Sequence, residues 1–186
     1  ADPSLIPSLL DENGEFHSSR TFRERFKRGE ELIDFDEACI EIRAQHDHFV
    51  EIVGREPDYF EAHAVMSKNL NRAISAVAQE LGLKEQKASF DPTAVVHCGD
   101  TDLRMVMHSM EPGYEPKDSI MQTVREMADG ETVVFVCHPG YLDRFILESS
   151  SLTTDRTKEV DALIDLELRT WLEAQDDLRL IDYRDL

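Results

Sequence analysis

The sequence of 186 residues predicts an α/β fold with a parallel sheet. Stretches of helical periodicity alternate with short apolar stretches, which is the order expected of repeated strand–helix units. In the clearest strand, Thr132–Cys137, the apolar residues are continuous rather than alternating, as in a parallel strand with both faces covered. A doubly wound sheet and a (β/α) barrel both fit this alternation. We expect a single α/β domain over residues 1–186.

The chain is predicted to begin with irregular structure and then to form a long helix. Residues 1–33 read as a loop-rich excursion with a short helix near Thr21–Phe26, because prolines and a turn-like run interrupt any apolar periodicity. A helix over Asp36–Val53 follows from apolar residues at helical spacing. Asp34 and Glu37 fit a capping box at its start, and a glycine directly after it marks its end.

The middle of the chain is predicted to add two strands and a helix. A strand over Tyr59–Val65 precedes a helix that Ser67 caps and Gly82 ends. A weaker extended stretch follows at Thr93–His97, and Gly99–Asp102 is predicted to be a turn.

The last third is predicted to hold the clearest strand between two helices, followed by a final strand. Pro116 suits the first position of a helix, Asp155–Ala174 has helical periodicity, and Leu178–Tyr183 reads as a closing strand. Four strands are too few to close a barrel. The chain is therefore expected to lack an N-terminal part of its fold, leaving an open sheet edge that a missing segment or another subunit covers.

The composition excludes several classes of function. Lys and Arg number 20 and Asp and Glu 39, so the formal net charge is −19. Such a surface repels phosphate backbones and anionic lipids, which argues against nucleic acid and membrane partners. No apolar run approaches the roughly 20 residues of a membrane span. Three cysteines without a CxxC pair fit a reducing compartment, so a cytoplasmic location is expected.

Two histidines stand at predicted strand ends, where parallel α/β folds place reactive groups. His63 comes late in the strand over Tyr59–Val65, and His138 follows Thr132–Cys137. We expect both to lie at the same end of the sheet and to open into one cleft. Glu61 precedes His63 by two residues, so on a regular strand both side chains point to the same face.

Other candidates carry less chemical meaning. His46 and His48 resemble a metal-binding pair, but two residues apart on a helix they point in nearly opposite directions, so both are predicted to face solvent. The sequence contains no GxGxxG, GxxxxGK[ST], HExxH or GxSxG motif. Nucleotide-binding, zincin and serine-hydrolase functions are therefore disfavoured.

Short motifs along the whole chain resemble those of the YdjC-like carbohydrate deacetylases, in the same order. Each motif is short, but together they are specific. They are the "PSL.DE.G.F" loop at Ile6–Phe16, the "GR.PDH.D.H" stretch within Glu41–His63, "CHPGY.D" at Cys137–Asp143, "SSLT..R..E" from Ser150 through Arg156 to Glu159, and a terminal "YRDL" at Tyr183–Leu186.

The resemblance implies a distorted (β/α) barrel and a metal-dependent hydrolase that removes N-acetyl groups from amino-sugar oligosaccharides. In that family an Asp and a His from two N-terminal motifs bind the metal together with the His of "D.H". Only the last maps here, onto His63, and the Asp of that motif is Glu61. The two N-terminal motifs are absent, so the chain is expected to be the C-terminal two-thirds of a complete deacetylase domain.

The resemblance also implies roles near the second histidine. His138 takes the place of the general acid that protonates the departing amine. Arg156 and Glu159 are expected either to act at the substrate or, as the favoured alternative, to tie the loop after His138 to the following helix. The residues expected to bind substrate or support the site are Glu61, Pro139, Gly140, Tyr141 and Arg156.

The implied cofactor is a divalent metal ion, Mg²⁺ or Zn²⁺, and the implied partner is an acetylated amino-sugar oligosaccharide. A homo-oligomer is expected, and either another subunit or the missing segment would cover the open sheet edge. The alternative function is a non-catalytic carbohydrate-binding or assembly module of the same fold. A metal phosphatase or nuclease is disfavoured by the acidic surface.

Overall fold

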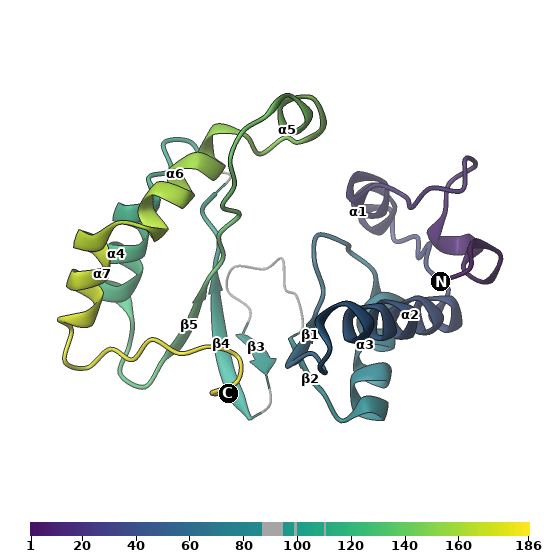
Figure 1. Ribbon diagram of the computed structural model, residues 1–186, viewed down its shortest axis with the longest axis horizontal. Helices are drawn as coiled ribbons and strands as arrows, with labels where there is room; N and C mark the ends of the chain where they lie inside the picture. The colour runs from purple at the N-terminus through teal and green to yellow at the C-terminus, as the bar shows by residue number, and fades with distance from the viewer. Residues whose placement is uncertain (87–94, 99, 110) are drawn as a thin grey trace. The chain divides into compact units, whose positions relative to one another are not determined.

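The computed structural model describes residues 1–86, 95–98, 100–109 and 111–186. It shows a mixed α/β fold that divides into two compact units (Figure 1). Unit 1 comprises Ala1–Ala88, His97–Asp100 and Tyr183–Leu186, and unit 2 comprises Ser89–Val96 and Thr101–Asp182. Among the described residues, no helix combines the length and apolar character needed to cross a membrane.

Unit 1 is built on a parallel pair of short strands. β1 pairs with β2 in the register Tyr59↔Lys84, Phe60↔Glu85 and Glu61↔Gln86, and α3 packs against both strands and against α2. Its core is formed by Ile6, Leu9, Phe22, Ile33, Ala38, Cys39, Ala73 and Val77. Its elements are the 3-10 turns η1 (Pro3–Leu5) and η2 (Pro7–Leu9), α1 (Ser19–Lys27), α2 (Phe35–Val53), β1 (Tyr59–Glu61), α3 (Lys68–Leu81) and β2 (Lys84–Gln86).

The start of α2 is capped as predicted, except for the reciprocal bond of the capping box. The Asp34 carboxylate accepts from the backbone N–H groups of Asp36 and Glu37 at 2.9 and 3.1 Å. The Glu37 carboxylate, however, accepts from the backbone N–H of Ser8 at 2.6 Å, and the Asp34 N–H donates to the Ser8 hydroxyl at 2.9 Å. Ser8 therefore takes the place that the sequence assigned to the Glu37–Asp34 bond, and it anchors the N-terminal segment to α2.

Unit 2 contains β4 and β5 of a sheet with the strand order β3-β4-β5. β4 and β5 are parallel, in register from Leu103↔Thr132 to Val106↔Phe135. α4 packs against α6 and α7, which also contact each other (Figure 1). The elements of this part of the chain are β3 (Val95–Cys98), at the boundary of the two units, β4 (Thr101–Val106), α4 (Pro116–Glu126), β5 (Thr132–Phe135), α5 (Arg144–Ser149), α6 (Thr154–Leu163) and α7 (Leu166–Glu173).

The α/β class and the parallel pairing of strands are confirmed, but several predicted boundaries are wrong. The strand over Tyr59–Val65 stops at Glu61. Part of the stretch Thr93–His97 lies outside the described residues; β3 covers its end. Thr101 and Asp102 belong to β4 rather than to a turn. β4 escapes a periodicity analysis because polar side chains interrupt its apolar positions.

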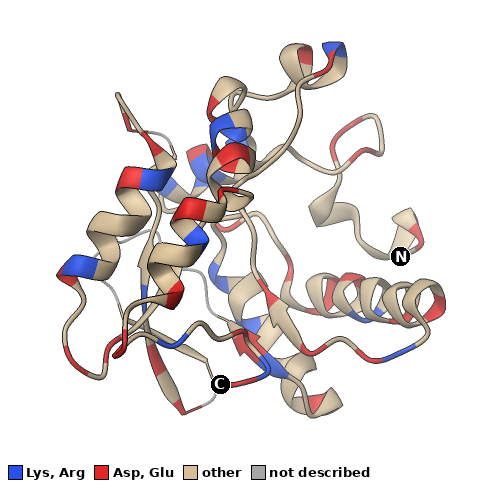
Figure 2. Ribbon diagram, turned by 60° about the vertical axis from the view of Figure 1, so that its left-hand side comes forward, with Lys and Arg blue, Asp and Glu red and all other residues tan. Residues whose placement is uncertain are grey.

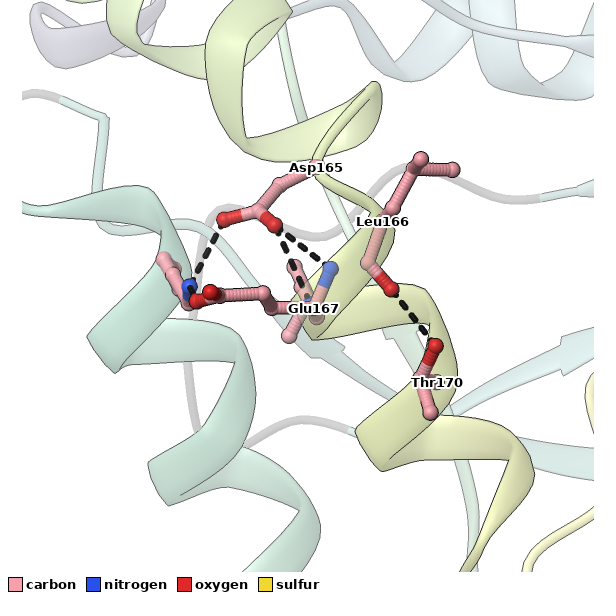
Figure 3. Close-up of polar contacts among 6 residues, drawn as sticks. Asp165, Leu166, Glu167 and Thr170 are labelled. Atoms are coloured by element: carbon pink, nitrogen blue, oxygen red, sulfur yellow. Dashed lines mark hydrogen bonds and ion pairs between the residues drawn. The ribbon is translucent and has the colours of Figure 1, made fainter.

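The helix predicted over Asp155–Ala174 is two helices, because Asp165 starts a new one. Its carboxylate accepts from the backbone N–H groups of Glu167 and Leu168 at 2.7 and 3.3 Å and binds the Lys117 ammonium at 2.7 Å (Figure 3). The hydrogen bond and charge of Lys117 lower the pKa of Asp165. A carboxylate held at the N-cap by a cation on α4 favours a break over a continuous helix.

The closing strand predicted over Leu178–Tyr183 is not a strand in the structure. Leu180 and Ile181 are exposed, so the apolar side chains that suggested a buried strand cover no sheet. Within unit 1, Tyr183 stacks on Tyr59 with ring centroids 4.2 Å apart, and the Lys84 ammonium donates to the Leu186 carbonyl. Side-chain contacts hold the C-terminus in place of strand pairing.

Charge is spread over the elements of both units. Figure 2 shows acidic positions in helices, strands and loops throughout the chain, with basic positions among them. The net charge of −19 is therefore not concentrated in a single segment.

Candidate functional site

His138 lies just beyond the carboxyl end of β5, as predicted. The Val136 N–H donates to the Val106 carbonyl at 2.8 Å, so the β4–β5 pairing reaches one residue past the strand. The parallel register therefore brings the loop after β4 next to the loop that carries His138. Functional side chains of parallel α/β folds gather at this edge.

Two buried side chains hold His138. The Ser109 hydroxyl, from the loop after β4, lies 3.2 Å from Nδ1 of the imidazole. The His138 backbone N–H donates to Oε2 of Glu159 on α6 at 2.6 Å. The other Glu159 oxygen accepts from the Tyr114 hydroxyl at 3.0 Å. Glu159 is only 1% exposed, so both oxygens are satisfied inside the protein.

The contact predicted between this loop and the following helix is present. Besides the Glu159 bond, the Gly140 N–H donates to the Arg156 carbonyl at 3.2 Å, and the Arg156 guanidinium donates to the Leu152 carbonyl at 3.0 Å. Pro139 is exposed, and Tyr141 is 80% exposed. Arg156 therefore supports the loop, while Tyr141 is presented to solvent.

The neighbouring thiol is not a nucleophile at neutral pH. Burial, with a smaller contribution from the charge of Glu159, raises the pKa of Cys137 to about 11. A thiol with that pKa is almost entirely protonated near pH 7. Among the groups around this loop, the imidazole is the one suited to proton transfer.

His63 belongs to unit 1 and lies in the loop beyond β1. Because the strand ends at Glu61, the alternation predicted to align Glu61 with His63 does not extend to the histidine. Ala64, directly after His63, has a φ of +57°, which a residue with a side chain rarely adopts. This strained conformation fixes the turn that carries His63.

Glu61 and His63 both line a cavity of about 510 Å³ in unit 1. Its walls are mainly apolar and come from α1, α2, α3 and the β1 region, with Phe22, Phe60 and Ile74 among them. A mainly apolar pocket of this size with some polar side chains is typical of small-molecule sites. Glu61 and His63 are two of the polar side chains on its wall; the others include His17, Glu41, Gln45 and His46.

His46 also lines this cavity, which contradicts the prediction that it faces solvent. It is only 9% exposed, whereas His48 is exposed as predicted. His46 Nε2 lies 2.6 Å from the Glu56 carboxylate and Nδ1 lies 3.1 Å from that of Asp47. These bonds, that to Glu56 first, raise the pKa of His46. Helix spacing separated the two histidines correctly, but the packing of the α2 face decided which of them is buried.

The predicted site residues fall into two groups, one in each unit. Glu61 and His63 share the cavity of unit 1, and His138, Pro139, Gly140, Tyr141 and Arg156 share the loop region of unit 2. That the two groups open into one cleft stays a prediction. Within the described parts of the chain, no group of three His, Cys, Asp or Glu side chains is arranged to hold a metal ion.

Sequence reasoning missed Ser109 and Tyr114. Neither belongs to a motif quoted above, and 29 residues separate Ser109 from His138. Of the three side chains that support His138, only Glu159 belongs to a motif visible in the sequence, the "SSLT..R..E" stretch.

Comparisons with known proteins agree with this architecture. A crystal structure of an Enterococcus faecalis protein named for cellobiose-phosphate cleavage superimposes with a TM-score of 0.77 at 22% identity, covering 100% of this chain and 71% of that one. This likeness shows the fold.

Relatives named carbohydrate deacetylase match nearly the whole chain. Carbohydrate deacetylase 2 of Listeria innocua is 25% identical over 182 residues, which are 96% of this chain and 70% of the relative. The carbohydrate deacetylases of Enterococcus faecalis and Geobacillus stearothermophilus are both 26% identical, covering 92% and 97% of this chain and 66% and 69% of their own. The YdjC-like protein family matches residues 1–174. The chain belongs to the YdjC-like family.

Proposed function

We propose that this protein takes part in removing N-acetyl groups from amino-sugar oligosaccharides. The observation that carries the proposal is His138, held at the carboxyl end of β5 by Ser109 and Glu159 in a chain of the YdjC-like family. The relatives' names supply the reaction class, deacetylation of a carbohydrate.

In this proposal His138 is the general acid. Hydrolysis of an amide expels an amine, which is a poor leaving group until its nitrogen is protonated. An imidazole is the side chain best suited to deliver that proton near neutral pH. Its backbone is fixed by the buried Glu159 carboxylate, so the ring is presented from a rigid loop.

The proposal includes a divalent metal ion, Mg²⁺ or Zn²⁺, with His63 as one ligand. The described residues do not complete a coordination sphere, because no three of their His, Cys, Asp or Glu side chains are arranged to hold a metal ion. This chain's described residues therefore account for proton transfer and binding, and not for activation of water. Glu61 is assigned to the support of His63.

The substrate proposed is an uncharged acetylated oligosaccharide. A net charge of −19 disfavours anionic substrates and suits a neutral sugar that becomes a cationic amine. Tyr141, largely exposed in the loop that carries His138, offers an aromatic face to a sugar ring. We further propose that the strand pairs belong to a distorted (β/α) barrel, in a homo-oligomer of the cytoplasm.

The test uses full-length protein that includes the two N-terminal metal-binding motifs. It measures acetate release from N,N′-diacetylchitobiose, metal content and melting temperature on the same samples. His138→Ala is expected to lower turnover by about 10²–10⁴-fold with unchanged metal content, the range for a lost general acid. His63→Ala is expected to lower metal content and turnover together. The control is His48→Ala, an exposed imidazole on α2 that is expected to change neither.

Two results would contradict the proposal. Full metal content and turnover in His63→Ala would end its assignment as a ligand. Binding of chitobiose without acetate release at any metal concentration, in a full-length protein that includes the two N-terminal metal-binding motifs, would favour the carbohydrate-binding module instead.

A further inference from the structure

Ser109 is a buried hydroxyl in contact with the imidazole of His138. It follows the carboxyl end of β4 and is 1% exposed, so bulk water has little access to its side chain. Its Oγ lies 3.2 Å from His138 Nδ1. The hydrogen bond at one ring nitrogen of a histidine determines which nitrogen carries the proton. Ser109 is therefore placed to control the protonation pattern of His138.

We propose that Ser109 is a positioning residue: its hydroxyl accepts a hydrogen bond from Nδ1–H of His138 and so reserves Nε2 for delivering a proton to the leaving amine. This inference rests on the proposed deacetylation. The charged imidazolium carries a proton on each ring nitrogen. With Nδ1–H donated to Ser109, Nε2–H is the proton available for transfer.

In this role Ser109 keeps its hydrogen bond to His138 before and after the proton is transferred. As the acyl C–N bond breaks, its electron pair stays on the amine nitrogen and forms a bond with the Nε2 proton of the imidazolium. His138 is left neutral with its proton on Nδ1, still donated to Ser109. Solvent then reprotonates Nε2. The Ser109 hydroxyl is thus an acceptor in both charge states, and the ring does not have to turn between them.

The backbone of His138 is also held in place, by Glu159. The His138 N–H is bonded to Glu159, and the other oxygen of that carboxylate is held by Tyr114. The backbone and Nδ1 are therefore fixed by two separate elements, α6 and the loop after β4. Removing the Ser109 hydroxyl therefore takes away the bond at Nδ1 and leaves the backbone bond to Glu159 in place.

The first arm of the test reads the tautomer of His138 directly. The full chain with isotope-labelled histidine is studied by long-range proton–nitrogen NMR, and His138 is assigned from the signals lost in His138→Ala. The neutral wild-type imidazole is expected to carry its proton on Nδ1. Ser109→Ala is expected to shift the population toward Nε2–H, and Ser109→Thr, which keeps a hydroxyl, is expected to restore it.

The second arm compares two substrates of different leaving groups. Ser109→Ala is expected to lower kcat for N,N′-diacetylchitobiose about tenfold, the scale of one lost hydrogen bond, without a change in KM. Turnover of para-nitrophenyl acetate, whose leaving group needs no proton, is expected to change less than about twofold. The control is Ser149→Ala, whose hydroxyl donates to the Phe145 carbonyl within α5.

The two arms separate this inference from the proposed function. An unchanged tautomer in Ser109→Ala, or a wild-type ring with its proton on Nε2, would overturn the role of Ser109. Equal losses on both substrates would overturn it too, because they would indicate a general loss of structure. If full-length protein that includes the N-terminal metal-binding motifs releases no acetate from chitobiose, the proposed function fails, while the NMR result still decides whether Ser109 sets the tautomer.

Discussion

Replacement of Glu159 is expected to destabilise unit 2, because its buried carboxylate satisfies two donors. The His138 backbone N–H and the Tyr114 hydroxyl reach its two oxygens at 2.6 and 3.0 Å. In Glu159→Ala both donors lose their acceptor inside the protein. Each unsatisfied buried donor costs about 1–3 kcal/mol, so the expected loss is about 2–6 kcal/mol of the free energy of unfolding.

Glu159→Gln is expected to cost less, about 1–2 kcal/mol, because the amide oxygen still accepts one bond. The amide nitrogen then faces the other partner, and both bonds lose their charged acceptor. Removing the charge also removes its desolvation penalty, which offsets part of the loss. This isosteric variant keeps the prediction testable if Glu159→Ala does not fold.

The assay is urea unfolding followed by the fluorescence of Trp171, the single tryptophan, which lies in the same unit. The matched control is Glu148→Gln on α5, an exposed carboxylate paired with Arg144, with an expected change below about 0.5 kcal/mol. If Glu159→Gln and Glu159→Ala both unfold at the wild-type urea midpoint, the buried carboxylate does not anchor the loop as described.

Three further predictions concern other parts of the chain. Glu56→Gln is expected to lower the free energy of unfolding by up to about 1 kcal/mol near pH 6. The difference from wild type should vanish as pH rises through the raised pKa of His46, because the imidazole then loses its charge. Urea midpoints measured against pH test this, and a difference that stays constant with pH would refute it. Cys137, with a pKa of about 11, is expected to react with iodoacetamide at pH 8 far more slowly in the folded protein than after unfolding. The folded Glu159→Gln variant is expected to react faster than the folded wild type, because one cause of the raised pKa is removed. Peptide mass spectrometry measures these rates, and equal rates in the folded and unfolded wild type would contradict the burial of the thiol. Asp34→Ala is expected to destabilise α2 by about 0.5–2 kcal/mol in thermal unfolding, whereas Asp34→Asn, which keeps the cap, should be nearly neutral.

Local chemistry explains the elements that could be predicted. The caps at Asp34 and Ser67 and the proline at the start of α4 act within one helical turn, so they are visible in the sequence. The same is true of the long apolar run of β5 and of the position of His138 after it.

Contacts across the chain explain what could not be predicted. Lys117 on α4 holds Asp165 where the periodicity alone continues a helix (Figure 3). The final apolar stretch looked like a strand, but strand formation needs a partner edge, and periodicity does not report one. β4 has polar residues among its buried ones, so only its pairing with neighbouring strands identifies it as a strand.

The sequence by itself determined the α/β class, the parallel pairing, the family and the placement of His138 at a strand end, because these depend on residue order and short-range periodicity. The tertiary structure alone decided that His46 is buried, that Ser109 contacts His138, and that Tyr114 holds the Glu159 carboxylate. These partners come from separate elements, so no spacing in the sequence encodes their distances. The physical reason is that hydrogen bonds at a site form where packing brings distant segments together, whereas periodicity describes only neighbours along the chain.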